Sequence, residues 1–110
     1  MESNTTTKSL FWKDEKTLIR SFDENGKPAH GLRIFKDENG KKVILRFLNG
    51  LLDGDFLEDG IKQVTQPAVE CEGHIEYWRK GMLHRDNGLP AVSTNGFTEE
   101  EWWENNKRIK

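Results

Sequence analysis

The chain has 110 residues, of which 34% are hydrophobic and 33% charged, and its 17 basic and 19 acidic side chains leave a net charge of −2. This length predicts one domain with a small core, and the eleven aromatic residues exclude a disordered chain. The near-neutral charge excludes the basic footprint of a nucleic-acid-binding protein.

Location and extent follow from the same composition. Cys71 is the single cysteine, so no intramolecular disulfide can form, which favours a reducing cytoplasm. No apolar run reaches the length of a signal-peptide core or a membrane span. We expect a cytoplasmic protein with a flexible polar tail over residues 1–9 and a single domain over 10–110.

Tight turns dominate the sequence. Seven of the ten glycines directly follow an asparagine or aspartate, and such pairs suit the central positions of turns that join antiparallel strands. They are Asn25-Gly26, Asn39-Gly40, Asn49-Gly50, Asp53-Gly54, Asp59-Gly60, Asn87-Gly88 and Asn95-Gly96. The sequence therefore predicts a mainly β fold, an antiparallel sheet of consecutive β-hairpins.

Strands are predicted between these turns. The segments that contain most of the Val, Ile, Phe and Tyr residues are 16–22, 31–36, 42–48, 68–71, 74–78 and 90–94. Residues 42–48 are nearly all apolar, so both faces of this strand should be covered, which predicts a central strand.

A unit recurs along the chain. Pro67-Ala68 and Pro90-Ala91 lie 23 residues apart, and each is followed by a glycine and then by an aromatic doublet, Tyr77-Trp78 or Trp102-Trp103. A looser copy begins at Pro28-Ala29. Self-similarity at this period is typical of stacked supersecondary units, here two-stranded hairpins.

Residues 98–104 carry two conflicting signals. Thr98 to Glu101 has the form of a capping box, and Phe97 with Trp102 occupies the positions of a hydrophobic staple, which together favour a helix start. The repeat instead places a strand over Trp102-Trp103. We favour the strand and keep one short helical turn near Thr98 as the alternative.

Residues 77–91 read Tyr-Trp-Arg-Lys-Gly-Met-Leu-His-Arg-Asp-Asn-Gly-Leu-Pro-Ala. This stretch resembles the unit YW-x-NG-x-x-HR-x-DG-x-PA of bacterial and phage proteins with MORN-like hairpin repeats, clearly over 66–108 and faintly over 25–56. The resemblance implies a row of β-hairpins with a binding or scaffolding role, and some relatives are antitoxin-like. Lys80 and Asn106 replace the usual Asn and Gly of the unit.

Three aromatic doublets, Phe11-Trp12, Tyr77-Trp78 and Trp102-Trp103, contain all four tryptophans. Adjacent side chains on a strand point to opposite faces, so each doublet should place one ring on either side of the sheet. Two readings stay open. The outward ring is covered by a loop, tail or neighbouring strand, or it joins an exposed patch that binds a partner or a second copy of the chain.

The second reading predicts a partner-binding surface. Its apolar anchors would be Tyr77, Trp78, Trp102 and Trp103, and its charged rim Arg85, Glu100, Glu101 and Glu104.

Candidate catalytic or metal-binding groups are few. The thiol of Cys71 and the imidazoles of His30, His74 and His84 are the side chains concerned, and Cys71 with His74 alone approaches zinc-hairpin spacing. The His84-Arg85-Asp86 triplet spells a kinase catalytic-loop motif without the other kinase motifs, so we expect these residues to flank a turn. We expect no catalytic residue, metal or cofactor.

These features favour a non-catalytic protein-binding module with a protein partner, and neither direct nucleic-acid nor membrane binding. Two alternatives stay open. One is a dedicated inhibitor of a specific enzyme, such as an antitoxin, an immunity protein or an anti-CRISPR-like phage anti-defence factor. The other is a small enzyme that depends on Cys71 and the histidines or on a metal. A homodimer also stays open.

Overall fold

The protein consists of antiparallel strands. The computed structural model describes residues 5–55 and 65–110, and within these ranges it contains strands and turns but no helix. This confirms the prediction of a mainly β fold of consecutive hairpins. The turn predicted at Asp59-Gly60 lies outside the described residues.

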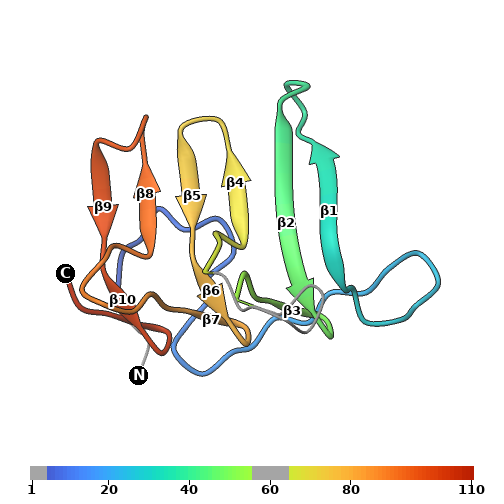
Figure 1. The fold of residues 1–110 in the computed structure, drawn as a ribbon, viewed down its shortest axis with the longest axis horizontal. Helices are drawn as coiled ribbons and strands as arrows, with labels where there is room; N and C mark the ends of the chain where they lie inside the picture. The colour runs from blue at the N-terminus through green and yellow to red at the C-terminus, as the bar shows by residue number, and fades with distance from the viewer. Residues whose placement is uncertain (1–4, 56–64) are drawn as a thin grey trace.

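Six strands form the body of one sheet (Figure 1). Their order is β1 (Gly31–Lys36), β2 (Lys42–Leu48), β4 (Val69–Cys71), β5 (His74–Glu76), β8 (Val92–Thr94) and β9 (Glu99–Glu101), and neighbours are antiparallel. The short strand β3 (Leu51–Leu52) pairs with the end of β2. Two further hairpins are β6 (Trp78–Arg79) with β7 (Met82–Leu83), and β10 (Trp103–Glu104) with β11 (Lys107–Arg108).

Most predicted strands are present. The ranges 31–36 and 42–48 coincide with β1 and β2, and β2 lies between β1 and β4, as predicted for a central strand. The prediction that both faces of this strand are covered is wrong, because Leu45 and Phe47 are buried on one face whereas Ile44 and Arg46 on the other are only half-buried. The other ranges near 68–71, 74–78 and 90–94 contain β4, β5 and β8.

The predicted strand over 16–22 is wrong. These residues are irregular apart from Phe22, which forms an isolated bridge to Pro28. The Asp14 carboxylate accepts the N–H groups of Lys16 and Thr17 and so turns the chain where the strand would begin.

The ambiguity over residues 98–104 is resolved in favour of strands. β9 and β10 occupy this range, and no helical turn lies near Thr98 in the described chain. The Thr98 hydroxyl donates to Asn95 O instead of accepting a bond from the N–H of Glu101. Asn95, Gly96 and Phe97 all have positive φ, which a helix start cannot contain.

Three units stand side by side, each a long hairpin followed by a short one (Figure 1). The long hairpins are β1–β2, β4–β5 and β8–β9. In the short hairpins Phe47, Trp78 and Trp103 occupy equivalent positions and pair with Leu52, Leu83 and Arg108. The looser first copy seen in the sequence is therefore a third unit of the same kind.

The turn of each short hairpin has two central residues with positive φ, as a type I′ turn requires: Asn49-Gly50, Lys80-Gly81 and Asn105-Asn106. These turns also link the units. The Gly81 N–H donates to Leu52 O and the Asn106 N–H donates to Leu83 O, each at 2.9 Å. The second and third short hairpins thus each bond to the unit before them.

One face of the sheet, the core face, is buried. A row of cross-strand partners runs along it from Leu45 through Val69, Glu76 and Val92 to Glu101, and all five side chains are buried. From Val69 onward, apolar and carboxylate side chains alternate in this row. The two glutamates therefore need hydrogen-bond donors inside the core.

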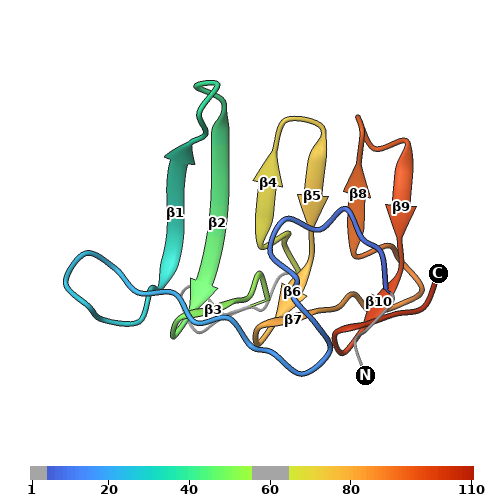
Figure 2. The same cartoon turned by 180° about the vertical axis from the view of Figure 1, so that it is seen from behind.

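Some of these donors come from residues 5–12, the N-terminal strap, which crosses behind the sheet in Figure 1 and in front of it in Figure 2. Residues 5–9 were expected to belong to a flexible tail. Instead Thr7 and Ser9 donate hydrogen bonds to core carboxylates. Residues 1–4 lie outside the described residues.

Candidate functional site

The core face is closed by a network centred on Glu76, which is fully buried. Its carboxylate accepts the Ser9 hydroxyl at 2.7 Å and the Leu10 N–H at 2.8 Å from the strap. It also accepts Trp78 Nε1–H at 2.9 Å and bonds His74 Nε2 at 2.7 Å. These contacts explain how a carboxylate is accommodated in the core.

Glu101 repeats this arrangement in the next unit. Its carboxylate accepts the Thr7 hydroxyl at 2.5 Å, the Lys8 N–H at 2.8 Å and Trp103 Nε1–H at 3.0 Å. Trp12 then packs on Trp103 with ring centroids 5.0 Å apart. A hydroxyl residue and the next backbone N–H therefore meet each glutamate, so the strap seals this face.

The opposite face, the open face, has no described element packed across its upper part (Figure 1). A row of cross-strand partners runs along it from Ile34 through Ile44, Glu70, Ile75 and Ser93 to Glu100. Leu32 and Ile34, at its β1 end, are 50% and 54% exposed. Arg46 forms an ion pair with Glu70 in the middle of this face.

Tyr77 and Trp102 extend the open face toward the short hairpins. Both are half-buried and stand between buried residues at a break between two strands, and Tyr77 also packs against the hydrophobic core. The Arg85 guanidinium lies 3.7 Å from the Tyr77 ring centroid, and Trp102 Nε1–H donates to Gly88 O at 3.0 Å.

A cavity of about 130 Å³ lies beside Trp102, with Arg85, Leu89 and Ile109 in its wall. The two aromatic rings are therefore held in place and remain half-buried.

The predicted partner-binding residues divide between the faces. Trp78, Trp103 and Glu101 are only 3%, 1% and 4% exposed, which assigns them to the core. Tyr77, Arg85 and Trp102 lie half-buried at the open face, while Glu100 and Glu104 are exposed. Tyr77-Trp78 and Trp102-Trp103 thus each bury the second ring and leave the first half-buried. For Phe11-Trp12 the alternation prediction is wrong, because this doublet lies on the strap outside any strand and both of its rings pack against the core.

Sequence reasoning missed the aliphatic part of the open face, formed by Leu32, Ile34, Ile44 and Ile75. The available signal was the alternation of Leu32 and Ile34 with Arg33 in β1. It could not show which of the two faces would be covered by the strap.

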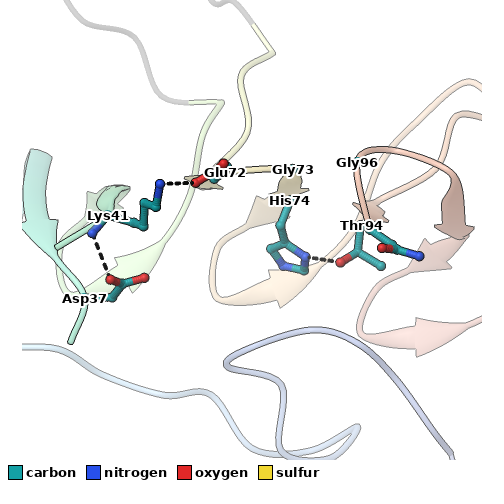
Figure 3. Close-up of a pocket in the computed structure, with 8 residues that line it drawn as sticks. Asp37, Lys41, Glu72, Gly73, His74, Thr94 and Gly96 are labelled. Carbon is teal, nitrogen blue, oxygen red and sulfur yellow. Dashed lines mark hydrogen bonds and ion pairs between the residues drawn. The ribbon is translucent and has the colours of Figure 1, made fainter. Parts of the chain in front are cut away.

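A polar groove of about 590 Å³ lies among the hairpin tips (Figure 3). Asp37, Lys41 and Glu72 form one wall, where Lys41 Nζ lies 3.0 Å from Glu72 Oε2. His74 and Thr94 form the other, with His74 Nδ1 2.8 Å from Thr94 Oγ1.

Thr94, His74 and Glu76 have the order of a hydroxyl–imidazole–carboxylate relay. Acyl transfer would also need N–H donors for a developing oxyanion. The Gly96 N–H in the groove wall donates instead to Gly73 O at 3.0 Å. Glu76 also accepts hydrogen bonds from the strap. The three side chains therefore connect the strap to the β4–β5 and β8–β9 hairpins.

Cys71 pairs in register with His74, but both ring nitrogens of His74 bond to other residues. Burial, and then the charges of Glu76 and Asp37, raise the pKa of the Cys71 thiol above its usual value. The thiolate is therefore disfavoured, which is the reverse of an activated nucleophile.

Each of the remaining histidines accepts a backbone N–H from the turn of a short hairpin, Asn49 for His30 and Asn105 for His84. His84 Nε2 lies 2.7 Å from Asp86 Oδ1, as expected for a turn-flanking residue, and His30 Nδ1 accepts the Asn49 N–H at 3.4 Å. Within residues 5–55 and 65–110, no group of three or more His, Cys, Asp or Glu side chains could hold a metal ion.

Comparisons with known proteins returned no family model that matches the chain, and no curated protein or solved structure that does so. In the part of the chain that the structure describes, no helix could span a membrane.

Proposed function

We propose that the chain is a non-catalytic protein-binding module that contacts its partner through the open face. The observation that carries the proposal is the asymmetry of the sheet. The strap closes the core face through buried carboxylates, whereas the open face presents four aliphatic side chains and two held aromatic rings.

The composition of the open face supports a protein partner. Tyrosine, tryptophan and arginine are enriched among the residues that dominate binding energy at protein interfaces, and Tyr77, Trp102 and Arg85 gather here. Because their side chains are already held by hydrogen-bond and cation–π contacts, little conformational entropy is lost on binding. The Arg46–Glu70 ion pair places charged groups at the centre of the open face, where they would favour a partner of complementary charge.

The same proposal places the protein in a reducing cytoplasm and among MORN-like hairpin-repeat proteins of bacterial or phage origin. The lone thiol and the unit over residues 77–91 support this placement.

Affinity capture from the native host, followed by mass spectrometry, tests the function. The informative variant is Ile75→Lys, which places a charge on the open face beside Glu70. We expect it to lose the proteins enriched by the wild type. The matched control is Leu18→Lys, which changes an exposed leucine outside the sheet and should capture them normally. Equal capture by all three proteins would contradict the proposal.

A further inference from the structure

Strand β1 is an edge strand with free hydrogen-bonding groups. It ends the strand order of the sheet and pairs only with β2 among the described strands. The Asp37 N–H donates to Lys41 O, which sets the phase of the ladder. Gly31, Arg33 and Phe35 then exchange bonds with β2, and the N–H and C=O groups of Leu32, Ile34 and Lys36 point outward.

The side chains along this edge are apolar and cationic. Leu32, Ile34 and Phe35 are each about half exposed. Lys36 lies directly opposite Lys42, and like charges so placed repel each other. In the described chain, no carboxylate forms an ion pair with Lys36, Lys42 or Arg33. The edge therefore combines unpaired backbone, apolar surface and uncompensated positive charge.

We propose that β1 accepts an extended acidic segment of the partner protein as an added antiparallel strand. This inference rests on the proposed function and names the partner's chemistry. Backbone bonds to Leu32, Ile34 and Lys36 would supply affinity, and side chains would supply specificity. Carboxylates belong opposite Lys36 and Arg33, and apolar residues opposite Phe35, Ile34 and Leu32. The segment thus reads acidic–apolar–apolar–acidic–apolar.

A second copy of the chain fits this edge less well. Two β1 strands paired about a twofold axis would bring Arg33 and Lys36 of both copies to one seam, where like charges repel. The opposite edge, β9, is acidic but has three residues, and Glu101 among them is buried under the strap. A separate acidic strand satisfies the charge along all of β1.

The test uses a synthetic peptide with the central sequence Glu-Val-Val-Glu-Val and a matched peptide with lysine in place of both glutamates. Amide hydrogen exchange is followed by NMR. We expect the glutamate peptide to slow exchange at Leu32, Ile34 and Lys36 and to leave Arg33 and Phe35, which already bond to β2, unchanged. The lysine peptide should have no effect.

Charge reversal provides the matched variant. The double variant Arg33→Glu and Lys36→Glu should bind the glutamate peptide at least about tenfold more weakly and should bind the lysine peptide. Lys107→Glu, on β11, should change neither. No protection of the outward amides at about 1 mM peptide, or equal protection by both peptides, would overturn the inference.

Ile75→Lys separates this inference from the proposed function. The substitution lies two strands away from β2 and leaves the outward groups of β1 intact, so peptide binding should persist. If the glutamate peptide does not bind while capture of the partner still depends on Ile75, the inference of an added strand on β1 is wrong and the open-face proposal stands.

Discussion

The packing of the core face depends on Glu76. It is fully buried, and the donors that surround it come from its own strand, from the following tryptophan and from the strap. A buried carboxylate is tolerated only when such donors replace water. The side chain therefore reports whether the strap and the sheet are assembled.

Glu76→Gln should lower the free energy of unfolding by about 1–3 kcal/mol, because the amide nitrogen cannot accept the bonds that one carboxylate oxygen accepts now. Urea denaturation followed by tryptophan fluorescence measures the change. Glu100→Gln, at an exposed position of β9, is the control and should alter stability by less than about 0.5 kcal/mol. Equal stability of both variants would show that the Glu76 network contributes nothing.

Asp86 gives a pH dependence of known sign. Its carboxylate accepts hydrogen bonds from Arg79 and then His84, and these lower the pKa of Asp86 to about 2. Because the folded pKa lies below the unfolded value of about 3.9, the contribution is present above pH ~4 and is lost as the pH falls toward 2. Solvent screening keeps it small.

Comparing the wild type with Asp86→Asn at several pH values isolates this contribution. The difference in unfolding free energy should be constant from neutral pH to about pH 5 and vanish near pH 2. A difference that persists unchanged at pH 2 would mean that the Asp86 carboxylate titrates normally or does not matter.

At the scale of the element, the type I′ turns of the short hairpins define the repeat. Asn106 stands where the turns of the first two short hairpins have Gly50 and Gly81, and it is almost fully buried. Its amide oxygen accepts the Leu83 N–H at 3.2 Å, and its amide nitrogen donates to Asp14 O at 3.0 Å. This departure therefore ties the last turn to the N-terminal segment.

Lys80, which stands where the other two turns have Asn49 and Asn105, adopts φ 51° without such a compensating side-chain bond among the described contacts. Asparagine tolerates this left-handed region better than lysine. Lys80→Asn should therefore raise the free energy of unfolding by about 0.5–1 kcal/mol, measured by thermal and urea denaturation. Lys107→Asn, in strand β11, is the matched control and should give no gain.

Strands β1 and β2 could be predicted because Asn39-Gly40 and Asn49-Gly50 mark their ends and β2 is a continuous apolar run, whereas the sequence predicted no strand at the position of β9. The role of Glu101 could not be predicted from the sequence. Next to Thr98 it has the form of a capping box, and its actual partners, Thr7 and Lys8, lie more than 90 residues away in sequence. The same long-range contacts explain why local sequence could not show that residues 5–9 pack on the sheet. They also explain why it could not show which aromatic rings are buried.

At the scale of the whole molecule, the strap couples the second and third units and covers one face of the sheet. A variant lacking residues 1–10 would leave the Glu76 and Glu101 carboxylates without their hydroxyl and N–H donors. We expect its free energy of unfolding to fall by at least about 2 kcal/mol. Urea denaturation of the full chain and the variant tests this. Unchanged stability would mean that the strap does not seal the core face in solution.

Binding through the open face is tested most directly by an isoleucine δ1-methyl NMR titration with the protein that Ile75→Lys fails to capture. Ile34, Ile44 and Ile75 lie in one row of the open face, and Ile19 lies outside the sheet. We expect the three row methyls to shift or broaden on binding while Ile19 stays unchanged. Binding that leaves all three unperturbed would contradict an interface at this face.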